Sequence, residues 1–154
     1  MPALLGCNPS GWFSAGSSAT SCKKNGIKKL THISTSEVYG QALEHPQKES
    51  YNGNVRCFGV RAAYSEGKRA AEAICYAYMQ EKKIDVRIAR IFNSFGPKMR
   101  IEDGRVIPNF IRSALVGAPL KIYGNGEQTR SFCYVDDTID GLIKLMNYDG
   151  DIQT

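Results

Sequence analysis

Several features that define large classes of proteins are missing from this sequence of 154 residues. No apolar stretch approaches the roughly 18 residues that a membrane-spanning helix needs. Residues 1–13 carry no basic side chain ahead of their short apolar patch, so we expect no signal peptide. The sequence therefore predicts a cytoplasmic protein without a membrane segment, and a parent protein of the Golgi type stays open as the alternative.

Patterns typical of metal and redox sites are also missing. The cysteines stand at 7, 22, 57, 75 and 133, never within three positions of one another, which excludes a local zinc knuckle or CxxC pair. Free thiols are the usual state in a reducing compartment. The two histidines, His32 and His45, form no HExxH motif, so we expect no bound metal.

Glycines are plentiful but are not spaced for the usual phosphate-binding loops. None of the 15 glycines lies three positions from another, so GxGxxG and GxxGxxG do not occur, and GxxxxGK is absent too. Such loops hold a dinucleotide pyrophosphate on backbone N–H groups at a helix N-terminus. This sequence therefore does not contain the usual pyrophosphate-binding loop.

Charge is mildly positive and scattered. The 20 Lys and Arg against 15 Asp and Glu give a net charge of +5, with one short basic cluster in residues 23–29. A nucleic-acid binder usually shows a basic stripe with interleaved aromatic residues, and we expect no nucleic-acid partner. The excess suits a protein that handles anionic small molecules such as nucleotides, and it equally fits an ordinary solvated surface.

Strand and helix patterns alternate after a first segment of different texture. Residues 1–22 show no regular periodicity, and we interpret them as poorly ordered. Beyond them the pattern predicts strands at 30–34, 86–92, 120–123 and 131–135, and helices at 62–82, 106–116 and 136–146, the last capped by Asp136. The alternation indicates an α/β fold in which the strands around Ile33 and Ile88 are parallel neighbours.

The sharpest local motif is Tyr64-Ser65-Glu66-Gly67-Lys68 in the predicted helix. Tyr64 and Lys68 are four positions apart, so both project from one face of that helix. A lysine ammonium beside a phenol stabilises the phenolate, which lets the tyrosine take a proton from a sugar hydroxyl. The motif alone also fits an ordinary pair on a helix surface.

A second candidate follows the first predicted strand, in the run STSEVYG at 34–40. Its hydroxyls and its carboxylate follow the C-terminal end of a parallel strand, where α/β sheets place ligands. A turn rich in small polar residues is the alternative interpretation.

Six blocks of sequence in the right order resemble the extended short-chain dehydrogenase/reductase family, the NAD-dependent epimerases and dehydratases. They read HISTSEVYG (32–40), EHPQKESYNGNV (44–55), RAAYSEGKRAAE (61–72), RIARIFNSFGPKM (87–99), EDGRVIPNFI (102–111) and YGNGEQTRSFCYVDD (123–137). The resemblance implies the second half of a Rossmann-like, doubly wound sheet in residues 23–95. It also implies part of a nucleotide-sugar-binding region in residues 96–154, NAD as cofactor, a UDP-sugar substrate and a homodimer.

Within this family the first block is most similar to the UDP-glucuronate decarboxylases. Thr35-Ser36-Glu37 stands where the dehydratases usually carry Thr-Asp-Glu and where many epimerases have no glutamate. Arg61 also resembles the decarboxylases. Another nucleotide-sugar epimerase or dehydratase of the family is the alternative.

The resemblance implies a closed redox cycle with assigned roles. NAD+ oxidises C4 of UDP-glucuronate with Tyr64 as the base, while Lys68 holds the nicotinamide ribose. The β-keto acid loses CO2, and NADH then reduces C4 to give UDP-xylose. Thr35 is implied to hydrogen-bond near O4, and Ser36 and Glu37 are implied to position the ring and manage the proton at C5.

The later blocks are implied to contact cofactor and substrate. Ser94 and Arg105 correspond to cofactor contacts, as do Tyr64 and Lys68. The implied substrate contacts are Asn93, Ile107, Pro108, Asn109, Phe110, Ile111, Tyr123 and Arg130. Arginine suits the diphosphate contact at Arg130 because its planar fork meets two phosphate oxygens at once.

Two parts of the family pattern have no counterpart in this sequence, the glycine-rich NAD-binding units ahead of residue 23 and a segment beyond residue 154. We therefore expect a fragment truncated at both ends that binds NAD poorly. We also expect it to self-associate through an open sheet edge at strand 30–34. A non-catalytic remnant is the alternative to an active enzyme.

Overall fold

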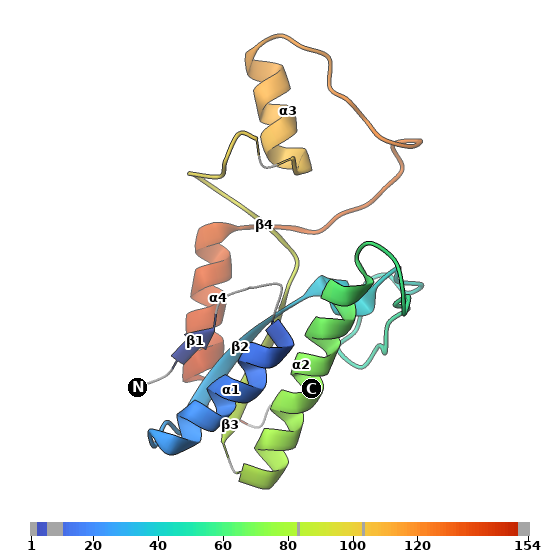
Figure 1. The fold of residues 1–154 in the computed structure, drawn as a ribbon. Helices are drawn as coiled ribbons and strands as arrows, with labels where there is room; N and C mark the ends of the chain where they lie inside the picture. The colour runs from blue at the N-terminus through green and yellow to red at the C-terminus, as the bar shows by residue number, and fades with distance from the viewer. Residues whose placement is uncertain (1–2, 6–10, 83, 103, 151–154) are drawn as a thin grey trace. The chain divides into compact units, whose positions relative to one another are not determined.

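The computed structural model describes residues 3–5, 11–82, 84–102 and 104–150 (Figure 1). The chain divides into two compact units. Unit 1 comprises Met1–Ile91 and Gly141–Thr154, and unit 2 comprises Phe92–Asp140. The division follows Ile91 rather than residue 95, the boundary expected from the sequence, and the chain returns to unit 1 near its end.

Unit 1 is built on a parallel sheet of three strands in the order β1-β2-β3. Strand β2 (Lys29–Thr35) pairs in parallel with β3 (Asp85–Ile91), with His32 opposite Ile88. This confirms the predicted parallel neighbours. Their connection runs through helix α2 (Ala62–Lys82), the βαβ arrangement of Rossmann-like folds.

Helices α1 (Gly11–Lys24) and α2 lie side by side over the sheet (Figure 1). Helix α2 has the predicted bounds, because its Ala, Glu, Lys, Arg and Met residues all favour helix. The core between these layers is made of small and aliphatic side chains, namely Ala19, Cys22, Leu30, Ala71, Cys75, Ile84 and Val86. Small residues on both helices let the two backbones approach closely.

The interpretation of residues 1–22 as poorly ordered is wrong for the part that the structure describes. Strand β1 (Ala3–Leu5) pairs in parallel with β2, and α1 buries Ala19 and Cys22 in the core. The segment shows little amphipathic periodicity, and the tertiary contact of its small residues with α2 accounts for the helix. Because β1 covers the edge of β2 at residues 30–32, the expected open edge there is wrong as well.

Unit 2 combines a short parallel pair, β4 (Asn93–Phe95) and β5 (Phe132–Tyr134), with helix α3 (Val106–Leu115). Strand β5 and helix α3 confirm the predicted elements to within a few residues. Strand β4 lies where the sequence pattern predicts no strand. The strand predicted at 120–123 is wrong, since this stretch is exposed and unpaired in the structure, and a short strand is stable only against a partner.

Helix α4 (Val135–Asn147) begins in unit 2 and continues into unit 1 from Gly141. It starts one residue before the predicted cap, so Asp136 lies in its first turn together with Asp137. Carboxylates stabilise a helix at this end because they face its positive pole. Within the described ranges, the structure has no helix with the length and apolarity needed to cross a membrane.

Candidate active site

The STSEVYG run forms the end of β2 and the short 3-10 helix η1 (Ser36–Tyr39). Thr35 has extended backbone angles and caps η1, its Oγ1 accepting a hydrogen bond from the Glu37 amide at 3.3 Å. The cap turns the chain sharply at the C-terminal end of the strand. Thr35, Ser36 and Glu37 are therefore presented together, half-buried, where parallel sheets bind ligands.

Tyr64 and Lys68 lie one turn apart at the start of α2. Lys68 is 3% exposed, and its Nζ donates a hydrogen bond to the Ile33 carbonyl of β2 at 2.9 Å. This bond ties the helix face that carries the motif to the strand two residues before Thr35. The half-buried Tyr64 lies on the same helix face, one turn toward the N-terminus of α2.

Glu37 is paired with Arg61, whose Nη2 lies 2.9 Å from Oε1 of the carboxylate. Arg61 directly precedes α2, and its side chain is 70% exposed. Both residues line a cavity of about 350 Å³. The sequence marks Arg61 only by its likeness to the decarboxylases, and the signal that could have placed it in the site is its position one turn before Tyr64.

The chain closes a loop directly after η1. Gly40 bridges to Asn54, and the Asn54 amide donates to the Tyr39 carbonyl at 2.8 Å. Gly40 has φ of 60°, and a side chain there would collide with the Asn54 backbone. Only glycine therefore lets the two ends of the loop meet so closely beside Glu37.

A buried histidine lies behind the lysine. His32 of β2 is 4% exposed, and neither ring nitrogen has a hydrogen-bond partner among the described residues. Burial, and to a smaller extent the Lys68 ammonium, lower the pKa of His32, while Glu72 opposes the shift. The histidine is therefore held neutral beneath the candidate site.

Unit 2 brings five of the remaining candidates to one cavity of about 240 Å³. The five are Asn93, Ser94, Arg105, Ile107 and Arg130. Asn93 Nδ2 donates to the Ser131 carbonyl at 2.9 Å, and Ser94 Oγ lies 3.1 Å from Thr138 Oγ1. Strand β4, which the sequence did not predict, is what places the first two of them beside β5.

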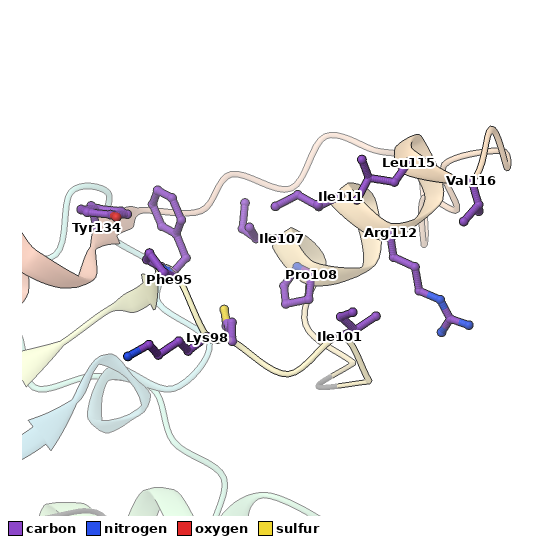
Figure 2. A pocket seen from close by; sticks show the side chains of 13 residues that line it. Phe95, Lys98, Ile101, Ile107, Pro108, Ile111, Arg112, Leu115, Val116 and Tyr134 are labelled. Atoms are coloured by element: carbon purple, nitrogen blue, oxygen red, sulfur yellow. The ribbon is translucent and has the colours of Figure 1, made fainter.

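A second, larger cavity of about 590 Å³ lies against α3 (Figure 2). The candidates Ile107, Pro108 and Ile111 line it, together with apolar side chains such as Phe95 and Leu115. Figure 2 shows the isoleucines of α3 on the side toward Phe95, while the Arg112 side chain extends away from it. The cavity is apolar and would accept a flat or aliphatic group.

Three candidates line neither of these two cavities. Asn109 donates from Nδ2 to the Gly104 carbonyl at 3.0 Å and so holds the turn before α3. The other two are Phe110 and Tyr123, and the ring of Tyr123 lies 5.1 Å from the Lys121 ammonium in an exposed stretch.

The βαβ arrangement with a tyrosine and a lysine one turn apart on the crossover helix defines a Rossmann-like protein of the short-chain dehydrogenase/reductase class. Within that class, this chain belongs to the NAD dependent epimerase/dehydratase family, whose family model matches residues 19–153.

The curated relatives are similar over most of this chain. UDP-glucuronic acid decarboxylase 1 of Xenopus tropicalis is 57% identical over 119 residues, which is 77% of this chain and 28% of the relative. UDP-glucuronic acid decarboxylase 3 of Arabidopsis thaliana is 59% identical over 118 residues, 77% of this chain and 34% of the relative. The chain thus spans about a third of the length of these proteins.

Solved structures share the fold. UDP-N-acetylglucosamine 4-epimerase of Methanobrevibacter ruminantium, in complex with UDP-N-acetylmuramic acid, has a TM-score of 0.79 at 33% identity and matches 90% of this chain and 44% of its own. UDP-glucuronic acid 4-epimerase of Bacillus cereus, in complex with UDP-glucuronic acid and NAD, has a TM-score of 0.77 at 29% identity over 92% of this chain and 43% of its own.

Proposed function

We propose that this chain carries the proton-transfer and sugar-binding part of a UDP-glucuronate decarboxylase. The observation that carries the proposal is the Thr35-Ser36-Glu37 turn, held at the end of β2 beside the helix face of Tyr64 and Lys68. The identity of 57% and 59% to two decarboxylases supports the same reaction. The product is UDP-xylose, formed through a 4-keto sugar.

In this reaction Tyr64 takes the proton of the C4 hydroxyl as hydride leaves the carbon. The Lys68 ammonium, fixed by the Ile33 carbonyl one turn from Tyr64, would hold the nicotinamide ribose of bound NAD. Thr35 hydrogen-bonds near O4, while Ser36 and Glu37 position the ring and manage the proton at C5. The Arg61 guanidinium pairs with the Glu37 carboxylate and orients it.

NAD is the cofactor we propose for this site, because the family is NAD dependent. It supplies the hydride chemistry, while the protein supplies orientation and proton transfer. Ser94 and Arg105 contribute cofactor contacts. Since this sequence has no glycine-rich pyrophosphate loop, we expect the isolated chain to bind NAD weakly, which calorimetry measures.

Unit 2 forms part of the nucleotide-sugar site in this proposal. Asn93 and Arg130 contact the diphosphate from the 240 Å³ cavity, and the guanidinium fork of Arg130 suits two phosphate oxygens. The turn and first residues of α3, Ile107–Ile111, contact the uridine, with Tyr123. The side chains of Asn93, Arg105 and Arg130 in the 240 Å³ cavity, together with the apolar 590 Å³ cavity, support a ligand with a charged and a flat part.

We further propose that the chain is cytoplasmic and self-associates. The free cysteines Cys22, Cys57, Cys75 and Cys133 suit a reducing compartment. Exposed apolar side chains of α3 and its neighbours, such as Leu115 at 82% exposure, favour association. Fluorescence microscopy of a tagged chain and light scattering of the purified protein test the two statements.

A chimera tests the reaction. Residues 32–137 of this chain replace the matching segment of UDP-glucuronic acid decarboxylase 1 of Xenopus tropicalis, and UDP-glucuronate with NAD+ is followed by mass spectrometry. Loss of CO2 to give UDP-xylose supports decarboxylation. A product that keeps its carboxylate, epimerised or dehydrated, overturns it in favour of another activity of the family, and a chimera that binds UDP without turnover supports a non-catalytic remnant.

A further inference from the structure

An ion pair outside the candidate site extends the face of α2 that carries Tyr64 and Lys68. Glu72 follows Lys68 by four residues, so the three side chains form one stripe along the helix. Two nitrogens of the Arg90 guanidinium, on β3, contact the Glu72 carboxylate. Nη2 lies 2.7 Å from Oε2 and Nε lies 3.0 Å from Oε1. The pair therefore joins helix and strand at a fixed angle.

The same pair contacts the chain on both sides of the Thr35–Glu37 turn. Before the turn, Ser34 Oγ donates to the Glu72 carboxylate. After it, Arg90 Nη1 donates to the Tyr39 hydroxyl at 3.0 Å, and the guanidinium lies 5.0 Å from the centre of the Tyr39 ring. Ser34 and Tyr39 thus flank the turn, and one ion pair anchors both.

Two further bonds fasten the loop that returns beside η1. Arg90 Nη1 also donates to the Glu49 carbonyl at 2.8 Å. Arg69, the residue after Lys68, donates to the carbonyls of Val38 at 3.1 Å and Asn52 at 2.6 Å. The end of η1 and the loop are therefore bound to the helix and to β3, and not only to each other.

The Glu72–Arg90 pair is buried enough that breaking it should lower the stability of this part of the fold. The side chain of Glu72 is 13% exposed and that of Arg90 is 23% exposed. Hydrogen bonding to Glu72 raises the pKa of Arg90 above its usual value, so the arginine stays charged at every pH at which the protein is folded. Removing either partner leaves a shielded charge without compensation.

We propose that Glu72 and Arg90 are positioning residues that hold the Thr35–Glu37 turn against the Tyr64–Lys68 face of α2. The reaction that this positioning serves is the proposed decarboxylation, and in that respect the inference rests on the proposed function. Neither residue is given a chemical step. They fix the distance between the base on the helix and the hydroxyls and carboxylate at the strand end, on which proton transfer depends.

The chain offers a matched control in the same strand. Arg87 of β3 forms a comparable pair with Asp85, Nη2 lying 2.8 Å from Oδ2, and Arg87 is 5% exposed. Arg87 also donates to the Gly150 carbonyl and lies 6.0 Å from the centre of the Tyr148 ring, so its contacts lie away from the turn. An Arg→Lys change at either position keeps the charge and removes the fork. The Arg87 variant makes the same change away from the turn, at a pair whose carboxylate is 38% exposed against 13% for Glu72.

The first measurement is amide hydrogen exchange in the full 154-residue chain, which needs no turnover. We expect Arg90→Lys to speed exchange of the Glu37 and Gly40 amides by about tenfold or more, since local opening there loses its main restraint. Arg87→Lys should leave those amides unchanged when the two variants are compared at equal loss of thermal stability. Equal acceleration in both variants overturns the proposal. If Arg90→Lys does not fold, Tyr39→Phe, which removes only a hydroxyl that Arg90 contacts, is used in its place. The exchange of the same two amides is then compared with that in Arg87→Lys.

The second measurement is steady-state kinetics in the chimera described above. Arg90→Lys and Glu72→Gln should lower kcat by about tenfold to a hundredfold with little change in KM for UDP-glucuronate, because the substrate still binds while the base is misplaced. Glu72→Asp should recover part of kcat, and Arg87→Lys should keep it. A change confined to KM, or an equal loss in Arg87→Lys, contradicts positioning. A parent chimera without turnover refutes the proposed function alone, since the exchange experiment stands independently.

Discussion

Units 1 and 2 hold their candidate residues by different means. In unit 1 a core that includes Leu30, Cys75 and Val86 lies between the sheet and its helices, and the Thr35–Glu37 turn is fastened to that framework. In unit 2, by contrast, Pro108 is the only buried residue among those whose side chains the structure describes. Its candidates are held by bonds to loop carbonyls, such as that from Asn93 to Ser131.

The difference teaches which unit depends on its own packing. Burial of apolar side chains supplies most of the folding free energy, and unit 1 has that burial within itself. In unit 2 large apolar side chains remain exposed, Leu115 at 82% and Val116 at 70% among them. Unit 2 therefore depends more on a bound ligand or a further surface, whereas the arrangement of the candidate residues in unit 1 is set by the folded chain itself.

The largest expected difference between the two units is in the kinetic parameter that a substitution changes. In the chimera, Tyr64→Phe removes the base, and we expect kcat to fall by about 10²- to 10⁴-fold with little change in KM. Arg130→Ala removes a diphosphate contact and should chiefly raise KM. Steady-state kinetics with UDP-glucuronate measure both parameters, and near-normal turnover of Tyr64→Phe would refute the mechanism.

The next largest expected difference is in how much the free energy of unfolding falls when a large apolar side chain of each unit is shortened. Leu30→Ala opens a cavity in the packed core of unit 1 and should lower the free energy of unfolding by about 2–5 kcal/mol. Ile111→Ala, at 55% exposure in unit 2, should change it by less than about 0.5 kcal/mol. Urea titration of both variants tests this contrast, and equal losses would mean that unit 2 also has a packed core.

Ligand binding should sharpen the contrast between the units. UDP at about a hundred times its dissociation constant stabilises the folded state to which it binds by about 2.7 kcal/mol. We expect amide exchange to slow in residues 93–99, 105–107 and 130–132, which contain the residues lining the 240 Å³ cavity, and to stay unchanged in the β2–β3 core. Protection confined to unit 1 would place the nucleotide elsewhere.

The smallest expected effect is on the pH dependence of folding stability, and it concerns unit 1 alone. Burial lowers the pKa of His32 below the ordinary value of 6.5 that it regains on unfolding. The unfolded chain therefore binds the proton more readily, and stability should be full above pH 6.5 and fall as the pH drops below it toward the folded-state pKa. His32→Gln should reduce this dependence in denaturant titrations at pH 7 and 5. An unchanged slope would show that other groups cause it.

The local sequence predicts the elements of unit 1 well where one pattern dominates. Helix α2 was predicted with its observed bounds from residue propensity, and the parallel pairing of β2 and β3 follows from the strand–helix–strand order. The sequence also predicts that Tyr64 and Lys68 share one face of α2, because residues four positions apart lie on the same side of a helix. The likeness to the family rests on the same continuous blocks.

What the sequence did not predict depends on contacts between distant residues. Helix α1 and strand β1 are composed of small residues without strong periodicity, and their structure depends on α2 and β2 as partners. The stretch 120–123 has the composition of a strand but lacks such a partner. The Glu72–Arg90 pair joins residues 18 positions apart on different elements, so no local pattern reveals it.

The closure of the loop after η1 has a consequence for how this fold can diversify. Gly40 and Asn54 meet at its base, so the residues between them form a closed ring, which Arg90 and Arg69 also hold at the Glu49 and Asn52 carbonyls. The entropy cost of such a ring grows only with the logarithm of its length, about 0.6 kcal/mol for each doubling. Insertions and deletions in residues 43–48 should thus be nearly neutral for folding, while the Gly40 junction itself tolerates no side chain. Residues 43–48 can therefore vary in length and composition during evolution while the Thr35–Glu37 turn keeps its place.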